Sequence, residues 1–377
     1  MTTEQKDLRP LAGVRVIDFT VVWAGPFAAM LMADLGAEVI KVENVRRMQP
    51  QTRGNKRVLK KEEIEGLGAL YAGYPDRDPG DKPYERHVMT PLFRNKLSVT
   101  INMLTKEGMD YFWRLVEKAD VIVENNVPET MDKLGLTYEA LKAVNPGIIM
   151  IRCPAFGADG PYRNFRAWGN HIEAVLGHTL LRGYEDGDPS TTVGIYSGDY
   201  QTGATAAFAA MTALHYRART GKGQLIELCQ VENGSQMFPQ SLSDWTMNHR
   251  IQGTIGNRDV HGAAPSGVYA CSGEDKWIAI DAWEDGEWRA LVEVMGQPGL
   301  LTDERFATVL DRQQNYRALD AVIEAWTRGH DSHGLAMRLQ AAGVACGEAG
   351  ARRLFDDLPA PPVQVERTGY GAPSLRR

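Results

Sequence analysis

Asp199 is the residue whose type and setting best suit a chemical role. It follows Gly198 in the run GDYQTG, and a strongly helical, alanine-rich stretch continues from 204 to 219. Asp199 would lie near a helix N-terminus, where exposed backbone N–H groups and the helix dipole favour an ionised carboxylate. An ionised carboxylate can act as a nucleophile. The position is also typical of an N-cap, so the residue alone leaves both roles open.

Two histidines and two tryptophans are further candidates. His171 and His178 are seven residues apart and would share a helical face, but no third ligand of suitable spacing is nearby. We therefore expect structural histidines and no metal site. Trp23 and Trp168 could form an aromatic wall for a bulky or cationic group, or they could pack in the core.

A basic cluster follows the strand expected at 38–42. Seven basic residues and no acidic residue occur between Arg46 and Lys61. Such a cluster could hold a polyanion, or it could be a solvated loop.

Composition limits the class of protein. With 377 residues the chain is longer than a single core usually supports, so two structural units are expected. The content of 43% hydrophobic and 24% charged residues is typical of a globular protein, and the net charge of −6 disfavours nucleic acid as a partner. The longest apolar stretches are shorter than a membrane span and the first residues are too polar for a signal peptide. We expect a cytoplasmic protein with no membrane partner.

The four cysteines are scattered without paired spacing, at positions 153, 229, 271 and 346. This spacing argues against a zinc site and against a disulfide framework. They are expected to be buried and reduced.

Short apolar runs alternate with helical patterns over the first half of the chain. Strands are predicted at 14–19, 38–42, 97–102, 121–124, 148–152 and 224–229, and helices at 26–35, 106–118 and 138–144. This alternation predicts an α/β fold in which a parallel sheet is covered by helices on both faces.

A second, smaller α+β unit is predicted from the change in texture after residue 225. Glycines are frequent from 253 to 273, a strand is expected at 277–282, and a helix is expected at 315–326. We predict a large Rossmann-like domain at 1–225 and a small domain at 226–330. The segment 331–377 is predicted to return to the large domain.

The turn after the first predicted strand does not favour a dinucleotide. Residues 20–26 read TVVWAGP, which lacks the G-x-G-x-x-G pattern, so NAD binding is not supported. A ligand could still bind at the carboxyl ends of the strands.

Many short motifs together resemble the family III CoA-transferases, the group of formyl-CoA transferase and carnitine CoA-transferase. They occur in order at residues 11–19, 24–27, 34–43, 94–96, 123–125, 134–136, 145–147, 157–161, 198–203 and 220–224, and the resemblance extends to about residue 355. It implies a homodimer whose two chains interlock. The proline-rich and arginine-rich end of this chain departs from the family pattern.

The resemblance also implies a reaction. Asp199 would attack an acyl-CoA carbonyl, form a mixed anhydride and release CoA, so that coenzyme A is carried as a thioester substrate and no cofactor is bound permanently. A carboxylic acid would be the second substrate. A glycine-rich loop, here including Gly262, would cover the intermediate.

The family's positions for coenzyme A and for the acyl group can be carried over by residue. Those for coenzyme A are Val22, Trp23, Asn44, Arg46, Arg47, Ile101, Asn125, Asn126, Lys133 and Leu134, and those for the acyl pocket are Trp168, His171, Glu173 and Gly262. Asn126 and Glu129 replace the usual Phe and Gly of the family motif.

Two alternatives remain open at this point. Related 2-methylacyl-CoA racemases have a His-Asp pair where this chain has Trp168 and Gly169, so a racemase would lack its base here unless Glu173 replaced it. A family member that binds CoA without catalysis is the other alternative. The sequence does not identify the acyl group, because small changes in pocket shape decide it.

Overall fold

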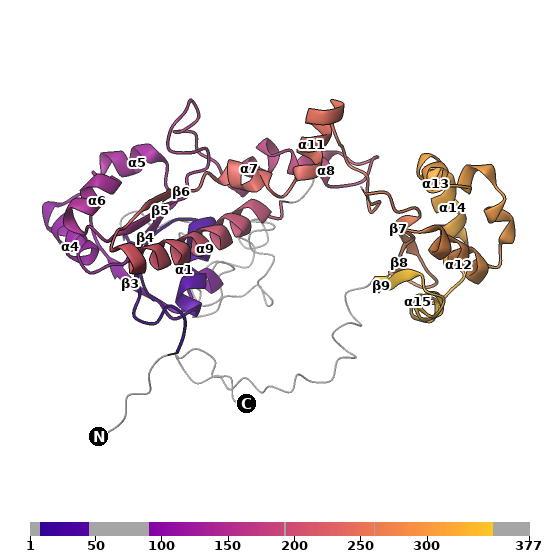
Figure 1. The fold of residues 1–377 in the computed structure, drawn as a ribbon, viewed down its shortest axis with the longest axis horizontal. Coiled ribbons are helices and arrows are strands. Elements are labelled where there is room, and N and C mark those ends of the chain that lie inside the picture. The colour runs from indigo at the N-terminus through magenta and orange to yellow at the C-terminus, as the bar shows by residue number, and fades with distance from the viewer. Residues whose placement is uncertain (1–7, 45–89, 192–193, 260, 350–377) are drawn as a thin grey trace, which may run out of the picture. The chain divides into compact units, whose positions relative to one another are not determined.

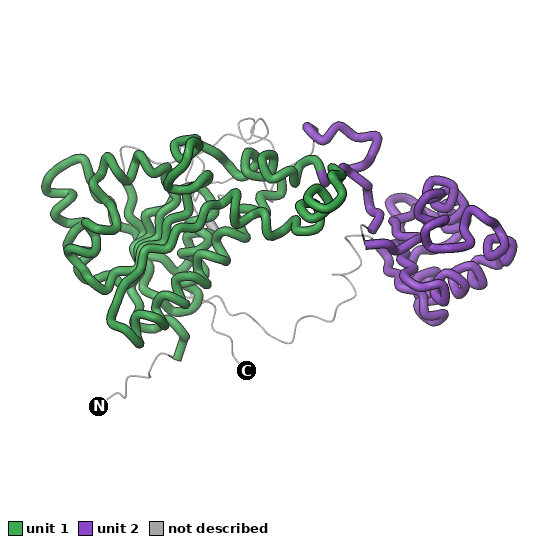
Figure 2. Tube along the Cα trace, turned by 45° about the horizontal axis from the view of Figure 1, so that its top comes forward, with its two compact units in different colours: residues 1–180, 192–252 green, residues 181–191, 253–377 purple. Residues whose placement is uncertain are grey.

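The computed structural model describes residues 8–44, 90–191, 194–259 and 261–349. The chain divides into two compact units, residues 1–180 with 192–252 and residues 181–191 with 253–377 (Figure 2). We call them unit 1 and unit 2 and describe each by itself. The basic cluster at 46–61 and residues 350–377 lie outside the described residues.

Unit 1 is built on a sheet of six parallel strands. They are β1 (Arg15–Phe19), β2 (Glu38–Glu43), β3 (Lys96–Thr100), β4 (Val121–Glu124), β5 (Ile149–Arg152) and β6 (Leu225–Glu227), in the order β3-β2-β1-β4-β5-β6. The order changes direction between β1 and β4, as in doubly wound sheets, which bind ligands at that point. The predicted parallel sheet is confirmed, with strand ends shifted by a few residues.

Helices cover both faces of this sheet. On one face, α1 (Ala24–Asp34) and α9 (Ser197–Thr220) form a core with β1 through Val16, Ala28 and Ala210 (Figure 1). On the other face, α4 (Lys106–Val116), α5 (Pro128–Lys133) and α6 (Tyr138–Val144) pack on Ile17 and Ile122. The described residues of unit 1 also form η3 (Thr90–Phe93), α7 (Gly169–Val175), α8 (His178–Leu181, whose last residue belongs to unit 2), α10 (Gln230–Ser235) and α11 (Pro239–Asn248).

Helices α1 and α9 approach closely because Gly203 lies between them. A Cβ atom at Gly203 would lie 2.7 Å from the backbone oxygen of Ala24 and 2.7 Å from the Phe27 ring. We expect Gly203→Ala to lower the free energy of unfolding by about 1–2 kcal/mol, since the clash outweighs the better helix propensity of alanine. Urea denaturation measures this loss. Ala204→Leu, at an exposed position of the same helix, is the control, and equal stability of Gly203→Ala and the wild type would contradict the packing argument.

Unit 2 has an antiparallel sheet of three strands, β7 (Ser266–Ala270), β8 (Trp277–Asp281) and β9 (Ala345–Ala349), in the order β7-β8-β9. Its helices are η4 (Pro189–Thr191), α12 (Asp285–Met295), η5 (Pro298–Leu301), η6 (Glu304–Phe306), α13 (Val309–Gln314), α14 (Tyr316–Thr327) and α15 (Ser332–Ala341). Ile278 and Ile280 of β8 pack on Leu291, Leu319 and Leu335.

The unit boundaries differ from those expected from the sequence. Residues 226–252 belong to unit 1, because α10 packs on α7 and α9 instead of on the small sheet. Residues 345–349, expected to return to the large domain, form β9 and pair with β8 in unit 2. In the described part of the chain, no helix is long and apolar enough to cross a membrane.

Candidate active site

Asp199 lies inside the first turn of α9. The residue before the helix, Tyr196, has a left-handed backbone with φ of +55°, and the chain enters the helix at Ser197. Tyr196 holds the N-cap position, so Asp199 is not the N-cap, and its side chain is 94% buried. The cap interpretation left open by the sequence is therefore wrong, and the carboxylate is available for another role.

Two other helices begin beside this carboxylate. The backbone N–H of Ala24, the first residue of α1, donates a hydrogen bond to it. Gly169, the first residue of α7, lies so close that an added Cβ would be 2.2 Å from Asp199 Oδ2 and 2.7 Å from the Tyr196 ring. Segments that are far apart in the sequence thus enclose one acidic group.

Burial raises the pKa of Asp199 to about 7. The negative charge of Glu173 raises it further, and the N–H of Ala24 acts in the opposite direction. We expected the helix N-terminus to keep this group ionised, but loss of hydration outweighs that effect. A carboxylate with this pKa is about half ionised near pH 7, and its ionised form is more basic than that of an exposed aspartate.

The turn between β1 and α1 is fixed by Asn125, which follows β4. Asn125 Oδ1 accepts a hydrogen bond from the Val21 N–H (2.7 Å), and Asn125 Nδ2 donates one to the Val21 carbonyl (2.8 Å). Val22 has a φ of +62°, which is a strained conformation for a β-branched residue. The turn places the Trp23 ring 4.9 Å from Tyr196 and 5.4 Å from Tyr200, measured between ring centroids.

Several positions predicted for coenzyme A follow the carboxyl ends of neighbouring strands. Val22 and Trp23 follow β1, Asn44 follows β2, Ile101 follows β3, and Asn125 and Asn126 follow β4, so one edge of the sheet carries them all. The Asn126 amide donates to the Phe19 carbonyl (3.1 Å), which gives this replacement of the usual Phe a structural role. Ile101 also lines a cavity of about 600 Å³ between β3 and α4.

The other predicted positions are less clearly placed for binding. Lys133 is exposed and pairs with Glu129 (2.6 Å), and Leu134 packs against the core beneath α5. Arg46 and Arg47 lie outside the described residues.

Predicted residues of the acyl pocket differ in setting. Trp168 is half-exposed at the start of α7, and its backbone N–H donates to His171 Nδ1 (3.1 Å). Glu173 is buried on the same helix. Gly262 belongs to unit 2, where its N–H donates to Asp259 (2.6 Å) and its carbonyl accepts from Gln313 (2.6 Å). The role of Gly262 as part of a loop that covers the acyl intermediate stays a prediction.

A buried ion cluster supports the first turn of α1, and the sequence analysis missed it. Asp18 is fully buried and accepts from Lys96 Nζ (2.8 Å) and Lys41 Nζ (3.1 Å), so its pKa is held below the ordinary range despite the burial. Lys96 Nζ also donates to the Pro26 carbonyl (2.8 Å). The signal was present, since Asp18 and Lys41 each stand between apolar residues within a predicted buried strand.

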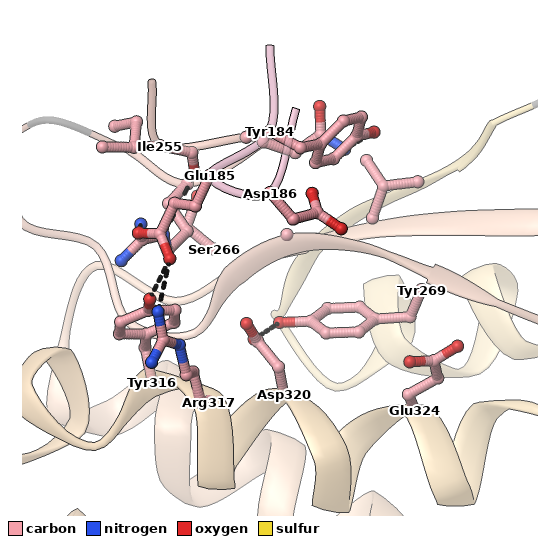
Figure 3. Close-up of a pocket in the computed structure, with 15 residues that line it drawn as sticks. Tyr184, Glu185, Asp186, Ile255, Ser266, Tyr269, Tyr316, Arg317, Asp320 and Glu324 are labelled. Atoms are coloured by element: carbon pink, nitrogen blue, oxygen red, sulfur yellow. Dashed lines mark hydrogen bonds and ion pairs between the residues drawn. The ribbon is translucent and has the colours of Figure 1, made fainter. Parts of the chain in front are cut away.

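Unit 2 has a cavity of its own, of about 510 Å³ (Figure 3). Glu185 accepts hydrogen bonds there from Tyr316 (2.5 Å) and Arg317 (2.9 Å), and Tyr269 donates to Asp320 (2.9 Å). These polar groups of the cavity wall pair with one another. None of the predicted site residues lines it.

Comparison with known proteins adds a family and named relatives. The model of CoA-transferase family III matches residues 11–357. The succinyl-CoA–D-citramalate CoA-transferase of Chloroflexus aurantiacus is 36% identical over 92% of this chain and 79% of its own length. The acetyl-CoA:oxalate CoA-transferase of Acetobacter aceti is 31% identical over 92% of this chain and 82% of its own. Among solved structures, a CAIB/BAIF family protein from Brucella suis is 30% identical with a TM-score of 0.74, covering 91% of this chain and 84% of its own.

Proposed function

The chain belongs to CoA-transferase family III, and from this premise we propose that Asp199 is the nucleophile that accepts the acyl group of the CoA donor. The enzyme moves coenzyme A from one carboxylic acid to another, as its named relatives do. The burial of Asp199 among three helix starts is the observation that supports the proposal, because it combines a basic carboxylate with exclusion of water.

The first step forms one bond and breaks one. The Asp199 oxygen attacks the thioester carbonyl, a C–O bond forms, the C–S bond breaks, and CoA leaves as a thiolate with the negative charge. The product is a mixed anhydride on Asp199. The thiolate then attacks the Asp199 carbonyl of the anhydride, which releases the donor acid as a carboxylate and leaves CoA as a thioester on Asp199. The acceptor carboxylate attacks this thioester and releases the thiolate again, and the thiolate attacks the acyl carbonyl of the new anhydride, which releases the new acyl-CoA and restores the Asp199 carboxylate. These intermediates must be shielded from water throughout.

Coenzyme A is proposed to bind as a substrate at the carboxyl edge of the sheet. The turn at Val22 and Trp23 adjoins both this edge and Asp199, which suits a long molecule whose thioester must reach the carboxylate. No permanently bound cofactor is needed for the chemistry.

The acceptor acid is proposed to be a small dicarboxylate. Relatives are named for D-citramalate, L-malate and oxalate, which are dicarboxylic acids, together with succinyl-CoA or acetyl-CoA as the thioester. A panel of these CoA donors and acids, followed by mass spectrometry, tests the function directly. Hydroxylamine should trap an acylated wild-type enzyme, and failure of every donor and acid pair would favour the non-catalytic alternative.

Racemisation is less well supported by the site. The Gly169 position, where racemases have a carboxylate, has no space for a side chain beside Asp199. Exchange of the substrate α-proton with deuterated solvent would reveal a racemase, whereas a transferase is expected to show none.

We also propose that the large unit is Rossmann-like and that the protein is a cytoplasmic homodimer with interlocked chains. Helix α11 and the residues after it expose Leu242, Trp245, Met247 and Ile251, and exposed apolar side chains of this kind are typical of interfaces. Light scattering after size-exclusion chromatography measures the number of chains.

The pH dependence of kcat/KM follows from the pKa of Asp199. The nucleophile must be ionised, and its pKa is about 7, so kcat/KM is expected to fall about tenfold per pH unit well below pH 7 and to level off above it. Carboxylic acid substrates are already ionised between pH 6 and 8 and do not produce this change. A rate that stays constant down to pH 5 would contradict the assignment.

A further inference from the structure

A second carboxylate, Glu173, lies buried beside the start of α9. Its side chain is 99% buried on α7, one turn after Gly169. Glu173 Oε1 accepts hydrogen bonds from the Ser197 N–H (3.1 Å) and the Ser197 hydroxyl (3.3 Å). Since Ser197 precedes Asp199 by two residues in the same helical turn, α7 contacts both ends of this turn.

His178 completes the group. Its Nδ1 lies 3.2 Å from Ser197 Oγ and 3.6 Å from Glu173 Oε1, and its ring packs on Phe238 with centroids 4.7 Å apart. Glu173, His178 and Ser197 therefore form one buried polar cluster, which we call the α9 start cluster. The sequence predicts Glu173 as a residue of the acyl pocket, and that role stays a prediction beside its contacts in this cluster.

Few other ionisable groups among the described residues lie near the start of α9 and could change the electrostatic environment of Asp199. The described elements that pack there contribute His178 from α8, which faces Glu173, His171 from α7, Tyr196 and Tyr200 from α9 and its cap, and an exposed Glu232 from α10. Helix α1 has no ionisable side chain before Asp34 at its far end. Glu173 is the buried acidic partner of Asp199 among these residues.

We propose that Glu173 is a positioning residue whose negative charge destabilises the free Asp199 carboxylate and thereby favours acylation of Asp199. The proposal rests on the function proposed above. Acylation converts Asp199 from a charged group into a neutral anhydride, and the departing negative charge leaves with the CoA thiolate. Repulsion between the two carboxylates is therefore present before the step and absent after it. Glu173 takes no proton and forms no bond to substrate.

Two substitutions separate charge from geometry. Glu173→Gln removes the charge and keeps an oxygen that can accept from Ser197, whereas Glu173→Asp keeps the charge and shortens the side chain. We expect Glu173→Gln to shift the acidic limb of the kcat/KM profile down by about 0.5–1 pH unit. The amount of acyl-enzyme that forms at equilibrium with the donor should fall by about three- to tenfold, because a change of about 0.5–1 unit in pKa corresponds to this factor in an equilibrium constant. Glu173→Asp should keep the wild-type limb.

The control is Glu139→Gln, which removes a charge from the exposed start of α6 and should leave the profile unchanged. An unchanged limb in folded Glu173→Gln, or a larger shift in Glu173→Asp, would overturn the proposal and leave Glu173 as a hydrogen-bond acceptor only. Where Glu173→Gln does not fold, Glu173→Met also removes the charge and fills the site, and the same limb decides. Trapping of acylated wild-type enzyme tests the nucleophile separately, so failure of this inference does not imply failure of the proposed function.

Discussion

Replacement of Asp199 by alanine or asparagine lowers the rate of CoA exchange by at least about 10³-fold and abolishes trapping of an acyl-enzyme, if the carboxylate carries the acyl group as proposed. The nearby carboxylate of Glu173 accepts from the Ser197 N–H through Oε1, and Gly169 and Ala24 lie against Asp199 itself. Initial rates with a succinyl-CoA donor and a dicarboxylic acceptor measure the loss. Asp159→Asn, at an exposed loop position, is the control for an Asp-to-Asn exchange.

The same substitution should have the opposite effect on stability. The pKa of Asp199 is about 7 in the fold and 3.8 in the unfolded chain, so the folded state binds the proton more tightly. Protonated Asp199 therefore contributes to the free energy of unfolding. This contribution is fully present below pH 3.8 and is lost as the pH rises through 7, and the loss is at most about 4 kcal/mol. Asp199→Asn should therefore be more stable than the wild type at pH 8.

The activity of the two Asp199 variants tests the nucleophile itself. If either variant kept more than about 10% of the wild-type rate of CoA exchange, the nucleophile assignment would be contradicted.

The second large effect is expected from the smallest substitution in the site, Gly169→Ala. The new methyl group would lie 2.2 Å from Asp199 Oδ2 and 2.7 Å from the Tyr196 ring, so the carboxylate must move. A displacement of this size costs about 10²-fold in kcat, since the attacking oxygen leaves the line to the thioester carbonyl. Steady-state kinetics separate this loss in kcat from a change in KM.

Gly286→Ala provides the comparison for Gly169→Ala. Gly286 also lies in the first turn of a helix, α12, but an added Cβ there has no neighbour within 4 Å. It should leave kcat within twofold of the wild type. If Gly169→Ala were equally harmless, the close approach of α7 to Asp199 would have no bearing on catalysis.

Much of the fold follows from local sequence, and the site does so only in part. Continuous apolar runs such as 121–124 and 148–152 predicted buried parallel strands, and the structure has β4 and β5 there. The unit boundary was misplaced because α10 has no local feature that reveals its packing on α9. Periodicity reports which side of an element is buried, but it does not report the partner.

The ionisation of Asp199 shows the same limit. Its position near a helix start could be predicted, and its family context predicted its role as the nucleophile. Its pKa depends on burial, on the hydrogen bond from the Ala24 N–H and on the charge of Glu173, and Ala24 and Glu173 are 175 and 26 residues away in sequence. Gly169 was noted only for the side chain it lacks. Its contact with Asp199 became visible in three dimensions.

The paired hydrogen bonds between Asn125 and Val21 have a consequence for affinity. They hold the loop after β1 in one conformation through hydrogen bonds within the protein, with Val22 in its left-handed state. When a ligand orders a flexible loop, the loss of conformational entropy costs about 1–2 kcal/mol of free energy per residue. Here that entropy is lost during folding. Binding of a long thioester is then opposed mainly by the loss of the thioester's own conformational entropy.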